Sequence, residues 1–391
     1  MNLIWFLSIG TFISLMFGEF GRFPFGGGTV SVTVLDLLLL LTVSFLSIWQ
    51  ISIKKDLKFF KCLNFFVPFL IIAMLSLILS GNLKGGLYLI RFSIYTLSFW
   101  IGYSVIFSKV SSLININKLI SIVGLILSIL GLLQLIVYPN LDSLTSFGYD
   151  PHQGRLVSTW LDPNFLGAFL NISLILTIYL WTHKKEKTWG LIGFVILLSI
   201  ILTFSRSAYL FLLVTLFIWG YFKFRKLLSL ALVVILLSYL ISPRFAERIN
   251  GAVNIDKSAR ERFVSWKSGV VIFQQKPLLG VGFNNLRYAY KNNNLIKTYS
   301  EDGGHSGAGV DSSLIFVLAT TGVLGFLGYM YFWYKVLQDH FNLSSLSLSV
   351  LSIFLGLLIN SQFINSLFFP PLMFTLFFWL GAVKAFKDFQ D

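Results

Sequence analysis

The chain has 391 residues, of which 56% are hydrophobic, 17% aromatic and only 12% charged. Because water-soluble globular proteins carry about 25% charged residues, this composition excludes a cytosolic enzyme and indicates an integral membrane protein. A single cysteine, Cys62, excludes an internal disulfide framework and a cysteine cluster for metal or redox chemistry. In a soluble domain the net charge of +14 would suggest a nucleic-acid partner. In a membrane protein it first reflects which side of the bilayer holds each cation, and we expect no nucleic-acid partner.

Near-continuous apolar runs of about 16 to 22 residues predict membrane-spanning helices and not the alternating pattern of a membrane barrel. They predict an all-α integral membrane protein with twelve spans in one polytopic domain, residues 1–391. The first span is not followed by a small-residue cleavage site, so we expect an uncleaved anchor. The expected spans are about 3–18, 32–53, 62–80, 87–108, 119–138, 164–182, 188–204, 206–222, 227–242, 310–335, 343–364 and 370–386.

Lysine and arginine in the short loops predict the orientation, because these residues stay on the cytoplasmic side. With the N-terminus inside, 15 of these cations fall in cytoplasmic loops or the C-terminal tail and 5 in outer short loops. This excess predicts that both termini are cytoplasmic. The segment 243–309, between spans nine and ten, is then an extracytoplasmic loop.

Arginines are distributed differently from lysines. Of the ten arginines only Arg225 falls on the expected cytoplasmic side. The positive-inside tendency does not predict this, and guanidinium groups are suited to grip phosphate oxygens in pairs of hydrogen bonds. We therefore expect an anionic ligand at the outer face. The alternative is an outer loop whose arginines pair with its own acids, Glu247, Asp256 and Glu261. The outer arginines are Arg22, Arg91, Arg155, Arg206, Arg244, Arg248, Arg260, Arg262 and Arg287.

The start of span six contains a helix-capping pattern. Asp162 is expected to cap the helix, and Pro163 to occupy its first turn, where no amide donor is needed. Arg155, seven residues before the cap, has no comparable local role in the sequence; its alternative is an interfacial residue that snorkels to water.

Two further arginines lie close to the expected hydrocarbon boundary. Arg206 occupies the minimal outer turn between spans seven and eight, where a cation needs a partner or must snorkel. Arg91 lies just inside the outer end of span four. Asp36, near the outer end of span two, is an alternative partner for Arg91.

The outer loop 243–309 contains a periodic segment. Its apolar residues at spacings of three and four, Phe263, Trp266, Val270 and Phe273, predict an interfacial amphipathic helix that stops at Pro277. The glycines around Val281 are expected to form a simple turn and not a phosphate cradle. A second short helix is expected to follow, and its polar residues are Asn284, Asn285, Arg287 and Tyr290.

Glu301, Asp302, His305 and Asp311 precede span ten in a glycine-rich stretch and supply groups that can accept a proton. The alternatives are a surface-loop histidine for His305 and a plain helix cap for Asp311. The spacing of these four residues matches no strong metal-ligand signature, so we expect no metal and no cofactor.

In this order, the features resemble the O-antigen ligase and Wzy-type polymerase superfamily of bacterial inner-membrane glycan-transfer proteins. The resemblance extends from about residue 155 to residue 325. The segments that carry it are Arg155-x6-Asp162-Pro163-Asn164, TFSRSA at 203–208, Arg262-x3-Trp266 with KPLLGVG at 276–282, and TTGVLG at 320–325.

The resemblance implies a large multi-span glycosyltransferase of GT-C-like architecture in the bacterial plasma (inner) membrane. It implies that a metal-independent, inverting enzyme transfers a glycan from a polyprenyl-diphosphate-linked oligosaccharide to a sugar hydroxyl at the outer face. The partners would be that lipid-linked donor and membrane lipid, with a chain-length regulator protein left open.

The residue types agree with this chemistry, which requires cations for the leaving diphosphate and a base for the acceptor hydroxyl. Arg155, Arg206 and Arg262 are the first candidates for the diphosphate, and Arg91 and Arg287 the second. Ligases of this family carry a histidine eleven residues before the glycine equivalent to Gly322, where this sequence has Asp311. We therefore take Asp311 as the first candidate for the base, His305 as the second, and a polymerase as a better fit than a ligase. A lipid-linked glycan flippase or other transporter is the third interpretation, although no internal repeat supports it.

Overall fold

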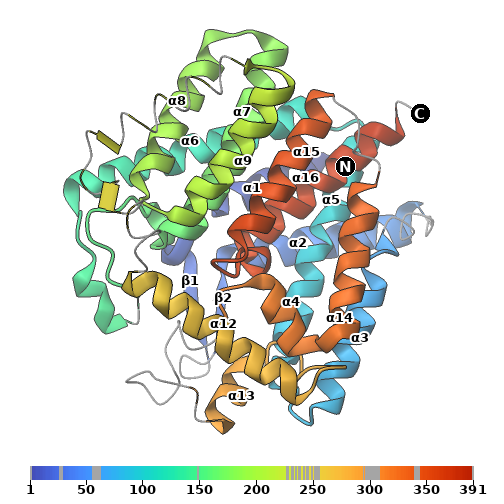
Figure 1. Cartoon of the computed structure of the whole chain (residues 1–391). Coiled ribbons are helices and arrows are strands. Elements are labelled where there is room, and N and C mark those ends of the chain that lie inside the picture. The colour runs from blue at the N-terminus through green and yellow to red at the C-terminus, as the bar shows by residue number, and fades with distance from the viewer. Residues whose placement is uncertain are drawn as a thin grey trace.

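The computed structural model describes residues 2–25, 30–54, 63–147, 149–225, 256–293, 309–338 and 344–389, with single residues between 229 and 250 and residue 295. It consists of helices and one small hairpin (Figure 1). The helices are α1 (Asn2–Ser14), α2 (Val34–Ile48), α3 (Val67–Leu79), α4 (Gly86–Thr96), α5 (Ser98–Phe107), α6 (Leu113–Val137), α7 (Pro163–Lys184), α8 (Lys187–Leu202), α9 (Arg206–Phe222), α12 (Lys257–Gln275), α13 (Leu286–Asn292), α14 (Ser313–Leu337), α15 (Ser345–Asn360) and α16 (Pro370–Asp388).

The apolar runs of the sequence coincide with these helices. The expected span 87–108 is divided into α4 and α5, and the expected span 227–242 lies largely outside the described residues. Within the described part, the segments long and apolar enough to cross a membrane are Val34–Ser52, Leu83–Phe107, Leu113–Val137, Pro163–Lys184 and Ser313–Leu337. The number of twelve spans, and their orientation, stay predictions.

A short antiparallel hairpin precedes α2. Strand β1 (Arg22–Phe25) pairs with β2 (Val30–Thr33), so that Arg22 lies opposite Thr33 and Pro24 opposite Ser31. Thr33 ends the hairpin and caps α2 through a capping box with Asp36. The apolar periodicity of the sequence does not predict this hairpin, which interrupts an otherwise helical fold.

Helix α12 lies across one end of the helices, and the chain termini lie away from it (Figure 1). Helix α14 packs against α12, and the first residue of α9 forms an ion pair with the residue that caps α12. The far ends of α7, α9 and α14 carry or adjoin Lys184, Lys223 and Lys335. Arg206 therefore lies at one end of these helices, and Lys184, Lys223 and Lys335 lie at the other.

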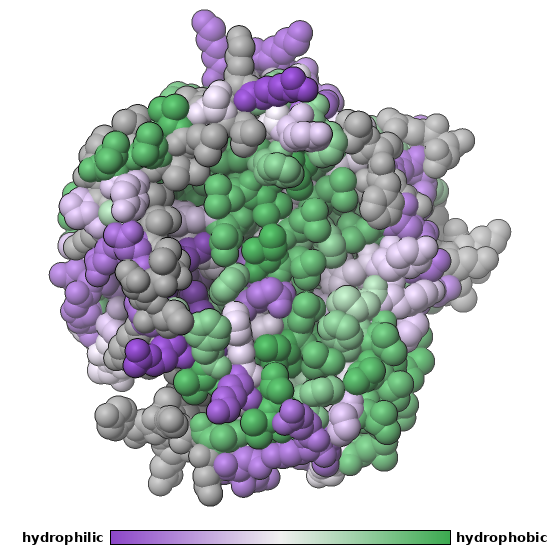
Figure 2. Space-filling view, viewed as in Figure 1, coloured by the Kyte–Doolittle hydropathy of each residue, from purple (hydrophilic) through white to green (hydrophobic). Residues whose placement is uncertain are grey.

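Apolar side chains cover much of the outer surface. Large aromatic side chains such as Trp100, Trp219 and Trp379 fill the core, whereas Met74 on α3 and Ile136 on α6 remain 56% and 79% exposed. Figure 2 shows a broad apolar area in the middle of one face, with polar side chains mainly toward its edges. A continuous apolar surface of this kind is suited to lipid and not to water.

Helix α14 is broken at Gly322. Its φ of 66° and ψ of −169° fall in a region that is essentially restricted to glycine. A helix break leaves backbone carbonyls without their usual amide partners, which is costly in an apolar environment. Here the amides of Val281 and Gly282 donate to the carbonyls of Ala319 and Thr320 at 3.0 and 3.1 Å.

The loop after α12 also satisfies the second side of the break. The amides of Val323 and Leu324 donate to the carbonyls of Pro277 and Leu278 at 2.8 and 3.2 Å. At Gly280 a side chain would collide with the backbone of α14, which explains why glycine is needed there. The turn expected around Val281 is thus the partner of the broken helix, and the two sequence segments KPLLGVG and TTGVLG form one structural unit.

Candidate functional site

Helix α12 positions Asp311 at the start of α14. Arg262, Ser265 and Trp266 share one side of α12 because they are separated by three and four residues. The Trp266 indole nitrogen donates to the carbonyl of Asp311 at 2.9 Å, and the amide of Asp311 donates to the Ser265 hydroxyl at 3.0 Å. These two bonds bring the Asp311 carboxylate into the electrostatic environment of Arg262.

The Asp311 carboxylate does not cap α14. Ser312 is the capping residue, since its hydroxyl accepts a hydrogen bond from the first turn of the helix. The cap alternative for Asp311 is therefore wrong. Burial raises the pKa of Asp311 to about 6; Arg262 opposes this shift, whereas Asp150 and Asp162 add to it. At neutral pH the group is a carboxylate with an increased affinity for a proton.

Arg206 is the first residue of α9, and its guanidinium donates to Asp256 Oδ1 at 3.0 Å. The same oxygen caps α12 by accepting from the amide of Ala259 at 2.8 Å. Asp256, an acid of the outer loop, thus pairs with an arginine outside that loop, and the alternative that the loop's arginines pair with its own acids is not met by this pair. Burial lowers the pKa of Arg262, and the nearby charge of Arg206 lowers it further, while Asp311 opposes the shift. Two guanidinium groups therefore share one partly desolvated region, which an anionic ligand would stabilise.

Arg155 has a structural role that the sequence does not reveal. Its Nε donates to the carbonyl of Thr203 at 2.9 Å, and its Nη2 to that of Phe204 at 3.3 Å. These carbonyls belong to the turn between α8 and α9. Ser205 in the same turn caps α9 and donates to the side chain of Asn164 at 2.7 Å. Arg155 therefore stabilises the turn from which α9 begins, and the expectation that it has no local role is wrong.

Asp162 caps α7, as the sequence predicts. One of its carboxylate oxygens accepts from the amides of Asn164 and Phe165 at 2.7 and 3.1 Å. Burial raises the pKa of Asp162, whereas these amides and the charges of Arg155 and Arg262 lower it. Asp162 is thus an electrostatic neighbour of both arginines. We use the name charged cluster for Arg155, Arg206, Arg262, Asp162, Asp256 and Asp311.

Arg91 lies outside the charged cluster. Its Nε and Nη2 donate to the two oxygens of Asp36 at 2.8 and 2.7 Å, and the Tyr95 hydroxyl donates to Asp36 Oδ1 at 2.9 Å. The pairing of Arg91 with Asp36, left open by the sequence, is therefore the arrangement found. This bidentate pair occupies the donors that a diphosphate would require.

Two candidate site residues from the sequence, Arg287 and His305, remain. Arg287 lies on α13, which packs against α12. His305, the second candidate for the base, lies outside the described residues, as do Glu301 and Asp302. In the described part of the chain, no three histidine, cysteine or acidic side chains form a metal-binding group.

The helix predicted for this segment is present as α12, and one of its sides packs against α14, whereas its placement at the membrane interface stays a prediction. Phe263 and Val270 are 51% and 40% exposed, whereas Gly269 and Ile272 are buried. Gly269 permits this packing because a side chain there would meet Ile315 of α14. Arg262 lies on this packed side, where Asp311, Arg206, Asp162 and Asp256 are its electrostatic neighbours.

Sequence reasoning does not connect Asp256, Ser265 and Tyr290 with the site around Asp311. Asp256 appears only as a generic partner of the outer arginines, and Ser265 does not appear. The hydroxyl of Tyr290 is buried with no hydrogen-bond partner among the described residues, and its pKa is raised by burial and by Asp311. The one local signal for these contacts is the spacing of Ser265 from Arg262, which places both on the same side of α12.

The apolar helices and the charged cluster define a helical membrane protein whose ionisable site lies at the ends of its helices. Residues 191–330 match the model of the Wzy_C family, described as O-antigen ligase. The match confirms the resemblance to the O-antigen ligase and polymerase superfamily for this part of the chain, and it supports a glycosyltransferase-like enzyme with a function of that broad type. It includes Arg206, Arg262 and Asp311, whereas Arg155 and Asp162 precede it. A comparison with curated proteins finds no match.

Proposed function

We propose that the protein is a polysaccharide polymerase of the outer face of the bacterial plasma membrane. It would transfer a glycan from a polyprenyl-diphosphate-linked oligosaccharide to a sugar hydroxyl of another lipid-linked repeat unit. The observation that carries this proposal is the grouping of Arg206, Arg262 and Asp311, because the reaction needs a diphosphate-binding cation and a proton acceptor near each other.

The arginines would act on the leaving group. When the bond between the anomeric carbon and the diphosphate oxygen breaks, negative charge develops on the diphosphate. Arg206 and Arg262 would stabilise this charge without a divalent metal. In the structure the Asp256 carboxylate accepts a hydrogen bond from the Arg206 guanidinium, so the diphosphate would replace the Asp256 carboxylate. Arg155 would contribute mainly by fixing the turn that begins α9.

Asp311 would act on the acceptor. Its carboxylate would take the proton from the attacking hydroxyl while the oxygen forms a bond to the anomeric carbon. Attack opposite the departing diphosphate inverts the configuration at that carbon. A pKa of about 6 leaves Asp311 ionised at neutral pH yet more basic than an ordinary aspartate, which suits a general base.

The distribution of cations supports the orientation. The charged cluster lies at the beginning of α7, α9 and α14, and the lysines lie at the other ends. If those lysines are cytoplasmic, as the positive-inside tendency predicts, the cluster faces outward and both termini are inside.

The alternative supported by the family description is an O-antigen ligase-type transfer to a lipid or protein acceptor. A flippase or other transporter is the second alternative.

Purified protein in lipid nanodiscs, incubated with a lipid-diphosphate oligosaccharide, distinguishes these functions. A product ladder indicates a polymerase, and a single shifted product on an added acceptor indicates a ligase. Transport of intact lipid across a vesicle, without transfer, indicates a flippase.

The role of the arginines is tested in the same assay. We expect Arg206→Ala and Arg262→Ala each to abolish the ladder while the protein remains monodisperse. Arg260→Ala is the matched control, because Arg260 lies on the same helix and is exposed. Wild-type chain length in either test variant would contradict the assignment of the diphosphate to this cluster.

A further inference from the structure

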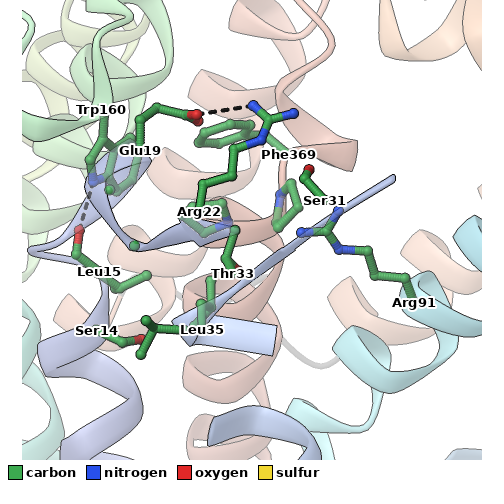
Figure 3. A pocket seen from close by; sticks show the side chains of 15 residues that line it. Ser14, Leu15, Glu19, Arg22, Ser31, Thr33, Leu35, Arg91, Trp160 and Phe369 are labelled. Carbon is green, nitrogen blue, oxygen red and sulfur yellow. Dashed lines mark hydrogen bonds and ion pairs between the residues drawn. The ribbon is translucent and has the colours of Figure 1, made fainter. Parts of the chain in front are cut away.

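A cavity of about 190 Å³, lined by polar and apolar side chains, lies beside the N-terminal hairpin (Figure 3). Its walls come from the 3-10 helix η1 (Gly18–Gly21), the hairpin, the start of α16, Trp160 and Arg91. The side chains of Arg22 and Glu19 remain 30% and 20% exposed, so the cavity reaches the surface of the protein. We call it the hairpin cavity.

The hairpin contributes one polar side to this cavity. Arg22 pairs with Thr33, and Ser31 pairs with Pro24, so the side chains of Arg22, Ser31 and Thr33 lie on the same face of the two strands. All three line the hairpin cavity, whereas the intervening residues Phe23 and Val32 do not. Alternation along the strands therefore directs hydroxyl and guanidinium groups inward.

The opposite wall is aromatic and apolar. Phe369, with the prolines that follow it, lines the hairpin cavity together with Trp160. The Phe369 ring stacks on Phe165 at 4.0 Å, and the Trp160 indole donates to the carbonyl of Leu15 at 2.8 Å. These contacts fix the rings in place before any ligand binds, so little entropy is lost on binding.

The cations of the hairpin cavity are neutralised by acids. Arg22 Nη1 lies 2.9 Å from Glu19 Oε2, and Arg91 is held by both oxygens of Asp36. Figure 3 shows the Arg22 guanidinium directed to Glu19 and Arg91 reaching toward the hairpin. A phosphate ligand would have to break these ion pairs, which is costly at partly buried sites. A neutral ligand with several hydroxyl groups can instead hydrogen-bond to their remaining donors and acceptors.

The segment that precedes α7 connects the hairpin cavity to the charged cluster. Trp160 lines the cavity, and Asp162, two residues later, belongs to the cluster. The Tyr149 hydroxyl donates to Glu19 at 3.1 Å, while the next residue, Asp150, raises the pKa of Asp311. The two sites are therefore neighbours on the same side of the protein.

We propose that the hairpin cavity is a saccharide subsite that binds a neutral sugar ring. The C–H face of the ring would rest against the aromatic wall, where the negative π face attracts partial positive charge. Its hydroxyl groups would bond to Ser31, Arg22 and Glu19. The assignment of a glycan as the ligand rests on the proposed function, whereas the choice of a neutral polar ring rests on the cavity itself.

Binding can be measured without catalysis. The probe is the neutral oligosaccharide fraction released by mild acid from the surface polysaccharide of the producing cell, titrated into the full-length protein in nanodiscs by calorimetry. We expect saturable binding that Ser31→Trp weakens about tenfold or more by filling the cavity. Val32→Trp is the matched control, since Val32 is adjacent in the strand and does not line the cavity. Glu19→Gln is a milder second variant, which should weaken binding without adding bulk.

The outcomes separate this proposal from the proposed function. Absence of binding to the wild type, or equal binding to Ser31→Trp and the wild type, overturns the subsite. Binding of inorganic diphosphate that depends on Ser31 and Glu19 and not on Arg206 also overturns it. Arg206→Ala should bind the oligosaccharide as the wild type does. Binding by a wild-type protein that never forms a ladder would refute the polymerase and leave the subsite standing.

The transfer assay distinguishes whether the hairpin cavity binds the acceptor glycan or the donor glycan. A lipid-free oligosaccharide has no leaving group, so it is extended if the hairpin cavity holds the acceptor glycan. It only inhibits transfer if the cavity holds the donor glycan. Either result in the wild type should be lost in Ser31→Trp and retained in Val32→Trp.

Discussion

Arg262 and Asp311 lie 49 positions apart in the chain, yet contacts made by Ser265 and Trp266 set their positions together. Those contacts involve the backbone of Asp311, so the carboxylate itself can be changed without removing them. Substitutions of the carboxylate therefore test its chemistry with little effect on the packing of α12 against α14.

The raised pKa of Asp311 predicts the pH dependence of transfer. The group must be deprotonated to accept a proton, and burial raises its pKa to about 6. The rate should therefore fall about tenfold per pH unit below this pKa and level off above it. Asp311→Asn should lower the rate by about 10² to 10⁴ and remove this pH step. Initial rates between about pH 4.5 and 8 provide the measurement, with far-ultraviolet circular dichroism as a control for folding.

His305→Ala is the companion variant. We expect it to lose less activity than Asp311→Asn and to keep the pH step. A greater loss in His305→Ala would move the base to His305.

Asp256 should compete with the substrate for Arg206. Asp256→Asn retains a helix-capping side chain but removes the negative charge. Because the ion pair is partly exposed, we expect the affinity for the lipid-diphosphate donor to rise only a few-fold. Asp388→Asn is a matched control, since Asp388 pairs with Lys384 at 3.0 Å near the end of α16. Weaker donor binding by Asp256→Asn would show that the carboxylate assists the site.

At the scale of elements, the break in α14 depends on a residue without a side chain. In Gly322→Ala the new methyl group would collide with the carbonyl of Leu278, and the backbone would occupy a region disfavoured for alanine. We expect a loss of stability of about 1 to 3 kcal/mol or more. Thermal unfolding in detergent measures this effect. Gly10→Ala in α1 is the control, because the space around that position is open and alanine favours helix.

Elements defined by local patterns could be predicted, whereas those fixed by distant partners could not. Apolar runs locate the helices, and Asp162 caps α7 because a cap needs only the next few amides. The break at Gly322 requires a partner loop about forty positions earlier in the chain, and no local pattern reports it. The packed side of α12 follows from the room that Gly269 leaves for α14, a contact that the apolar periodicity of α12 does not predict.

The same distinction applies to the charged cluster. The arginine pattern predicts an anion site, and the structure brings Arg206 and Arg262 into one electrostatic environment. The partner of Arg206 could not be singled out, because Asp256 lies fifty positions away among other acids. The pair of Arg91 and Asp36, in contrast, could be predicted. Both residues lie near the outer ends of their expected spans, and the ion pair is present.

At the scale of the whole molecule, the segregation of cations predicts the topology. A periplasmic-side reporter fused near Asn292, beyond α12, should be active, and one fused near Lys185, at the far end of α7, should be silent. An active reporter at Lys185 would invert the orientation. Fusions that leave the first six spans intact provide the control for insertion.

The hydrogen bonds across the break in α14 have a mechanical consequence. Together with the bonds made by Ser265 and Trp266, they join α12 and its following loop to both sides of the break in α14, and this unit carries both Arg262 and Asp311. A displacement of this unit by a bulky lipid-linked chain would move the guanidinium and the carboxylate together, so the distance between them would be conserved. An enzyme built in this way could admit substrates of increasing length without resetting its reaction geometry at each round.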